Sequence, residues 1–135
     1  MENTPYALRR TSDLGLDEAV GAVIRALAGN GFGVLTTIDV AATLRARLGV
    51  DVPGYVILGA CNPTLAHRGL DAEPDLGVLL PCNVVVREEA GGTVISAMDP
   101  VAALSLAGNP ALEPLAAEAR VLIERSLASL DDAPA

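Results

Sequence analysis

Apolar residues recur at two spacings along the chain, and these spacings predict strands that alternate with helices. Apolar residues that alternate with polar ones, or run together briefly, predict strands at residues 6–11, 32–38, 55–60, 78–88 and 93–98. Apolar residues that return every three or four positions predict helices at residues 17–28, 39–49, 63–73, 100–108 and 111–130. The strand at 55–60 is apolar throughout, which favours a central place in the sheet.

Proline, glycine and asparagine mark where these elements begin and end. Three Asx-Pro pairs predict helix starts, because the side-chain oxygen accepts a free backbone N–H while proline suits the first helical position. The pairs are Asn62-Pro63, Asp99-Pro100 and Asn109-Pro110. Pro81 interrupts the run at 78–88 and indicates an edge or a bulge, since proline cannot donate to a strand ladder. Gly91-Gly92 predicts a hairpin turn before the last strand.

The order of the elements favours an α+β fold. Strands that alternate with helices also occur in parallel, doubly wound sheets. The hairpin at Gly91-Gly92 and the short helix at 39–49 oppose that arrangement, so we expect two layers, a largely antiparallel sheet covered on one face by the first and last helices. We expect a single domain over residues 1–135, with an ordered core at about 6–130 and a frayed tail at 131–135.

The amino-acid composition limits which binding partners and which cellular compartment we expect. Of the 135 residues, 51% are hydrophobic and only 2% are aromatic, so the core must be aliphatic. Nine arginines, no lysine and 17 acidic residues give a net charge of −8, which argues against nucleic acid as a partner. No apolar run approaches the roughly 18 residues of a membrane span, and the first residues lack the apolar centre of a secretory signal. We therefore expect a soluble cytoplasmic protein with no membrane partner.

Two cysteines are candidates for chemistry. Cys61 directly precedes the helix capped by Asn62, where free N–H groups and the helix dipole stabilise a thiolate, so Cys61 is the candidate nucleophile. The alternative is that Cys61 is a small buried hydrophobic residue at a strand end. For Cys82, which follows Pro81, burial is at least as good an explanation. A partnership of the two thiols depends on the fold, because no CxxC spacing joins them.

His67 is the one histidine in the sequence, six residues after Cys61. Cys61, His67 and Cys82 are candidate metal ligands, because two thiols and an imidazole suit an open zinc or copper site. Their spacing matches no standard zinc motif, and a solvated or capping histidine is the alternative. Together with Asn62, the same three residues form the candidate ligand-binding set. The sequence names no cofactor for them.

Three segments of the chain resemble a known family. They are Gly31-Phe-Gly-Val-Leu-Thr-Thr-Ile-Asp39, Leu58-Gly-Ala-Cys-Asn-Pro-Thr-Leu-Ala-His67 and Gly77-Val-Leu-Leu-Pro-Cys-Asn83. Over residues 6–130 the chain is similar to the bacterial and archaeal family called domain of unknown function 302. The resemblance implies an α+β layer of the TATA-binding-protein type and a tendency to form homodimers, and it supplies no reaction. It does not imply DNA binding, because function does not follow from a shared fold.

Three kinds of function therefore stay open. We favour a dimeric module that binds a small ligand or a metal in a pocket near the Cys-Asn-Pro and Leu-Leu-Pro-Cys segments. The first alternative is a thiol-based enzyme or redox sensor that uses Cys61, and the second is a structural or interaction protein. The absence of lysine excludes a Walker lysine and Schiff-base chemistry. Whether the protein is an enzyme is left open.

Overall fold

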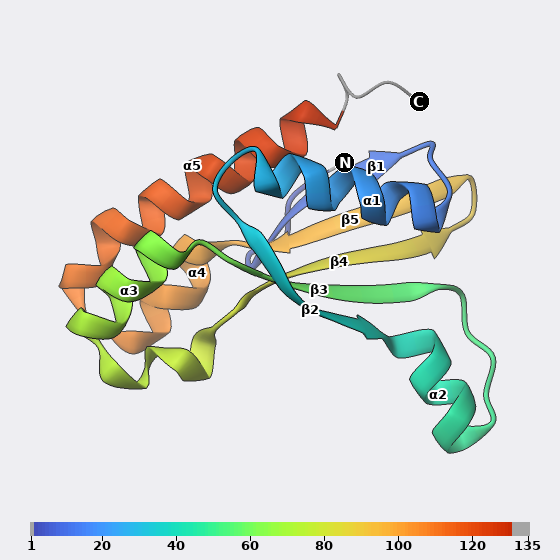
Figure 1. Ribbon diagram of the computed structural model, residues 1–135, viewed down its shortest axis with the longest axis horizontal. Coiled ribbons are helices and arrows are strands. Elements are labelled where there is room, and N and C mark those ends of the chain that lie inside the picture. The colour runs from blue at the N-terminus through green and yellow to red at the C-terminus, as the bar shows by residue number, and fades with distance from the viewer. Residues whose placement is uncertain (1, 131–135) are drawn as a thin grey trace.

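Five strands form one sheet in the order β1-β5-β4-β3-β2 (Figure 1). The structure is a computed structural model, and it describes residues 2–130. The strands are β1 (Ala7–Ser12), β2 (Gly33–Asp39), β3 (Tyr55–Cys61), β4 (Cys82–Glu89) and β5 (Gly92–Met98). Every neighbouring pair is antiparallel, so β4 is the middle strand while β1 and β2 are the edges.

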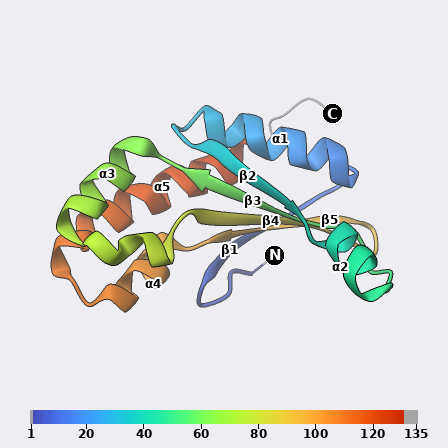
Figure 2. The same ribbon diagram turned by 60° about the horizontal axis from the view of Figure 1, so that its bottom comes forward.

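Helices cover one face of this sheet and gather beyond one of its ends (Figure 2). They are α1 (Leu16–Ala28), α2 (Val40–Leu48), α3 (Pro63–Ala72), α4 (Pro100–Leu104) and α5 (Glu113–Ser129), with 3-10 helices at Pro74–Leu79, Ser105–Ala107 and Pro110–Leu112. α1 and α5 pack against each other and against the sheet, whereas α2 projects away from both layers. The predicted α+β fold with an antiparallel sheet is confirmed. Within residues 2–130, no helix has both the length and the apolar character needed to cross a membrane.

The alternation of side chains along the strands decides which face of the sheet is buried. Val84 and Val86 of β4 belong to the core cluster beneath α1 and α5, and both are almost completely buried. The residue between them, Val85, therefore points to the opposite face. A second apolar cluster joins the 3-10 helix at 74–79 to the helices beyond the sheet end. It consists of Leu65, Leu76, Leu104, Leu112, Leu115, Ala116 and Ala119.

The predicted Asx-Pro caps form as expected. The side chains of Asn62, Asp99 and Asn109 each accept a hydrogen bond from a backbone N–H of the helical turn that follows. The three distances are 3.1, 2.9 and 3.0 Å. Asp39 likewise accepts from the Ala42 N–H at 2.9 Å and starts α2. Each bond satisfies a donor that would have no partner inside the helix, so local sequence sets these starts.

The predicted strand at 78–88 is partly wrong. Residues 74–79 form a 3-10 helix, the Leu80–Pro81 peptide bond is cis, and β4 begins only at Cys82. Because the proline precedes the strand, β4 keeps all its donors and serves as the middle strand, not as an edge. β3, expected at the centre, lies between β4 and the edge strand β2. The predicted tail at 131–135 lies outside the described residues.

Candidate functional site

A cavity of about 330 Å³ lies at the end of the sheet where β3 and β4 meet α3 and α5. Two segments singled out by the sequence form part of its wall: Cys61-Asn62 and Leu80-Pro81-Cys82. The remaining wall is apolar, and it consists of Phe32, Leu35, Ala60, Leu65, Ala66, Leu70, Leu76, Gly77, Leu104, Leu115 and Ala119. Among residues 2–130, no charged side chain lines this cavity, so its interior favours apolar groups over ions.

The turn from β3 into α3 positions the Cys-Asn-Pro segment. Cys61 is the last residue of β3 and pairs with Gly33 of β2. Asn62 leaves the strand and caps α3 through the Leu65 N–H. Gly31, at φ +85°, passes close to this cap, because a Cβ at Gly31 would lie 3.1 Å from the amide nitrogen of Asn62. The loop that enters β2 therefore packs directly on the start of α3.

The two thiols lie at adjacent strand ends. Cys82 pairs with Ala60 in the β3–β4 register, which puts Cys61 one residue further along the neighbouring strand. Both cysteines are free thiols, partly buried, and both line the cavity. Burial raises the pKa of Cys82 from 9.0 to about 11, and the nearby Cys61 acts in the same direction. Cys82 is therefore a neutral thiol at physiological pH.

His67 lies apart from the other candidate residues. Its side chain is 81% exposed on α3, and its Nε2 lies 3.8 Å from Oδ2 of Asp71 one turn later. It does not line the cavity. Among residues 2–130, no three histidine, cysteine or acidic side chains are grouped closely enough to hold a metal ion. The fold thus gathers Cys61, Asn62 and Cys82, and it does not assemble the predicted metal set.

Several residues of the cavity wall could not be identified from the sequence. Leu35 is one, because it occupies a bulge between Val34 and Thr36 and is 68% exposed beside the cavity. The helical stripe at 111–130 predicts that Leu115 and Ala119 face the core. It could not indicate that these two residues face an open cavity, because that depends on segments distant in sequence. Only the fold brings them opposite the thiols.

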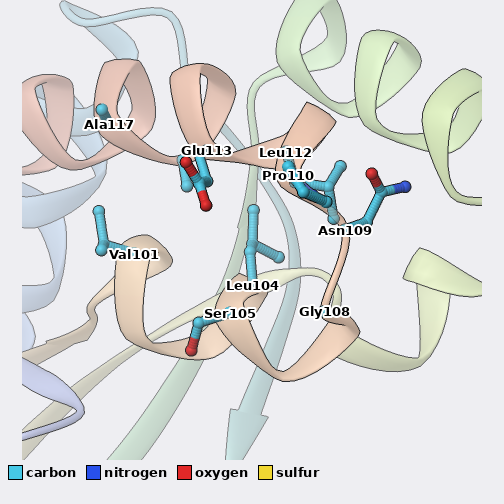
Figure 3. Close-up of a pocket in the computed structure, with 10 residues that line it drawn as sticks. Val101, Leu104, Ser105, Gly108, Asn109, Pro110, Leu112, Glu113 and Ala117 are labelled. Atoms are coloured by element: carbon cyan, nitrogen blue, oxygen red, sulfur yellow. The ribbon is translucent and has the colours of Figure 1, made fainter.

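A second hollow, of about 490 Å³, lies between α4 and the start of α5 (Figure 3). Val101 and Leu104 extend from α4 toward α5, whereas the amide of Asn109 points away from the gap. Two of its polar groups are already engaged, because the Ser105 hydroxyl donates to the Ala102 carbonyl and the Asn109 amide donates to the carbonyl of Ala72. The carboxylate of Glu113 also lines the hollow. This hollow holds neither thiol nor arginine, so the cavity at Cys61 and Cys82 is the stronger candidate site.

Comparison with known proteins gives the family. The sequence matches the family described as domain of unknown function DUF302 over residues 8–130. The chain belongs to the DUF302 family. It is similar to the crystal structure of uncharacterized conserved protein DUF302 from Bacillus stearothermophilus, with a TM-score of 0.84 and 31% sequence identity. The match covers 90% of this chain and 95% of that chain. No curated protein matches. The family resemblance predicted from the three segments is confirmed.

Proposed function

We propose that this DUF302 protein is a binding module that holds a small, neutral, apolar molecule in the cavity at Cys61 and Cys82. The observation that carries the proposal is the composition of the wall. In the part of the chain that the structure describes, its polar side chains are two thiols and the amide of Asn62, and none of its side chains is charged. Ligand pockets are mostly apolar, with few polar groups, and span roughly 300–1,000 Å³. A cavity of about 330 Å³ suits a ligand at the small end of that range.

The state of the thiols supports a neutral ligand. Because its raised pKa of about 11 keeps Cys82 protonated, this side chain presents a weak S–H donor and no charge. A charged ligand would lose its hydration on entry and gain no partner of opposite charge. Apolar contact with the leucines of the wall would supply most of the affinity, at roughly 25 cal/mol for each Å² buried.

The cavity can be tested with a neutral fluorescent probe, 1-N-phenylnaphthylamine, which emits strongly in apolar surroundings. We expect saturable binding to the native protein. Ala66 lines the cavity from α3, so Ala66→Phe places a ring in a space of about 330 Å³. Probe affinity should fall about tenfold or more, because excluded volume removes the contacts that hold the ligand.

The matched control is Ala128→Phe, the same substitution at an exposed position of α5 outside the cavity. This variant should bind the probe like the native protein. Equal probe affinity in the native protein and in Ala66→Phe, both folded by circular dichroism, would contradict the proposal. Loss of probe binding in both Ala66→Phe and Ala128→Phe would show that the fluorescence does not come from the cavity, and it would contradict the proposal as well.

We also propose that the module is a homodimer and that the second copy covers the β2–α2 segment. α2 has no buried residue, although it is nine residues long. Five large apolar side chains are exposed within this short stretch of chain: Leu35, Ile38, Leu48, Val50 and Val52. Exposed apolar surface favours a protein partner. A symmetric contact through this segment would leave the thiols in place on each copy.

A further inference from the structure

A groove of about 440 Å³ lies over β1, β3, β4 and β5, on the face of the sheet opposite the core cluster. Its floor follows from strand alternation: Leu8, Val86 and Ile95 lie in the core cluster, so the residues next to them point to the other face. The lining residues include Tyr6, Arg9, Tyr55, Asn83, Arg87 and Ser96. None of them lines the cavity at the thiols, so this is a separate site.

Strand register places two arginines across this groove from each other. Arg9 of β1 pairs with Ser96 of β5, and Ser96 pairs with Val85 of β4. Arg87 follows two residues after Val85 and points to the same face. The two arginines are therefore two strands apart, with β5 between them, and each strand spacing is about 4.8 Å. Two long guanidinium side chains can converge on one small ligand across that separation.

The charge of the groove is opposite to that of the whole molecule. The chain carries a net charge of −8, yet within residues 2–130 no aspartate or glutamate lines the groove. Arg87 lies 3.5 Å from Oε1 of Glu89 and its side chain is 28% exposed. Arg9 is also partly buried, and within residues 2–130 it has no ion-pair partner. A partly buried guanidinium without a carboxylate is an available binding group for an anion.

We propose that this groove binds a small molecule carrying an oxyanion, either a carboxylate or a phosphate. Arg9 and Arg87 hold the oxyanion, because the planar guanidinium donates two parallel hydrogen bonds to such groups. Ser96 and Asn83 supply neutral polar groups beside them, and the rings of Tyr6 and Tyr55 enclose the body of the ligand. This site is distinct from the apolar cavity: the groove selects an anion, whereas the cavity at the thiols selects a neutral apolar molecule.

The protein contains its own reporter for this groove. Tyr6 and Tyr55 are its two tyrosines, the chain has no tryptophan, and both tyrosines line the groove. Titration with inorganic phosphate, and separately with succinate, should change tyrosine emission saturably at constant ionic strength. A response to phosphate alone assigns the site to phosphates, and a response to succinate alone assigns it to carboxylates. No saturable change with either anion would overturn the proposal.

Single substitutions then test whether the anion binds in the groove. Arg9→Gln and Arg87→Gln should each raise the apparent Kd about tenfold or more, because each removes a charge-assisted contact. Asn83→Asp tests the same site without removing an arginine. The exposed side chain keeps its size and gains a negative charge that repels the anion, so this variant should weaken binding as strongly. The control Arg47→Gln changes the net charge equally on the exposed surface of α2.

Two outcomes of the variant series would also overturn the proposal. Equal loss of binding in Arg47→Gln would show that net charge, not the groove, attracts the anion. A change in the mass of the protein in solution on Arg9→Gln or Arg87→Gln, together with a native protein that responds to neither anion, is the second such outcome. The groove would then be an interface between copies of this chain and not a ligand site.

Discussion

At the scale of single residues, the two thiols line one cavity, and burial sets the protonation state of Cys82. Burial raises the pKa of Cys82 to about 11, so a thiol on the middle strand stays protonated at neutral pH. The thiolate is the species that reacts with alkylating agents. At pH 7 about one Cys82 in ten thousand is a thiolate, a fraction too small to support nucleophilic chemistry at an appreciable rate.

We predict that iodoacetamide modifies Cys61 faster than Cys82 near pH 7, as read by peptide mass spectrometry. The rate at Cys82 should rise about tenfold with each pH unit until it levels off near pH 11, because the thiolate fraction rises in that proportion below the pKa. The variants Cys61→Ser and Cys82→Ser each leave one thiol, so they show which modification rate belongs to which cysteine. A Cys82 that reacts as fast as Cys61 at pH 7 would contradict this assignment of the pKa.

At the scale of elements, a close approach between α3 and the 3-10 helix at 74–79 shapes the cavity. Gly69 is buried on α3, and a Cβ there would lie 2.6 Å from Cδ2 of Leu76. Leu76 is 2% exposed and cannot move aside freely. The absence of a side chain at Gly69 thus lets Leu76 seal one wall of the cavity.

We predict that Gly69→Ala destabilises the protein by about 1–2 kcal/mol, because overpacking against Leu76 outweighs the roughly 1 kcal/mol that alanine gains in a helix. Gly77→Ala is the matched control, since a Cβ at Gly77 meets nothing within 4 Å. It should leave the free energy of unfolding nearly unchanged. Urea denaturation measures both, and a Gly69→Ala protein more stable than the native one would be incompatible with this packing.

The same elements show what the sequence could and could not predict. Asn62, Asp99 and Asn109 were sufficient to predict helix starts, because a cap depends on residues only a few positions away. The error at 78–81 has a different origin: an apolar run resembles a strand whether it pairs in the sheet or, like Leu79 and Leu80, packs against an apolar cluster beyond the sheet. Convergence of the thiols, and of Arg9 with Arg87, depends on strand order and register, which no local pattern encodes.

At the scale of the whole molecule, α2 projects from the body (Figure 1), and the apolar side chains of Ile38, Leu48, Val50 and Val52, in this helix or next to it in the chain, are exposed. We predict a mass of about 28 kDa by light scattering, twice the 13.8 kDa of one chain. Leu48→Glu places a charge among these side chains and should give the mass of one chain. Leu106→Glu, at another exposed leucine remote from α2, is the control and should stay dimeric. A native mass near 14 kDa at micromolar concentration would exclude the homodimer.

Native mass spectrometry of protein purified without denaturation tests the apolar cavity most directly. We predict that the native protein and Ala128→Phe retain a small organic molecule that solvent extraction removes, and that Ala66→Phe, with its cavity filled, retains none. A native protein that carries no organic adduct, or the same adduct on Ala66→Phe, would contradict the assignment of the cavity at Cys61 and Cys82 as a ligand site.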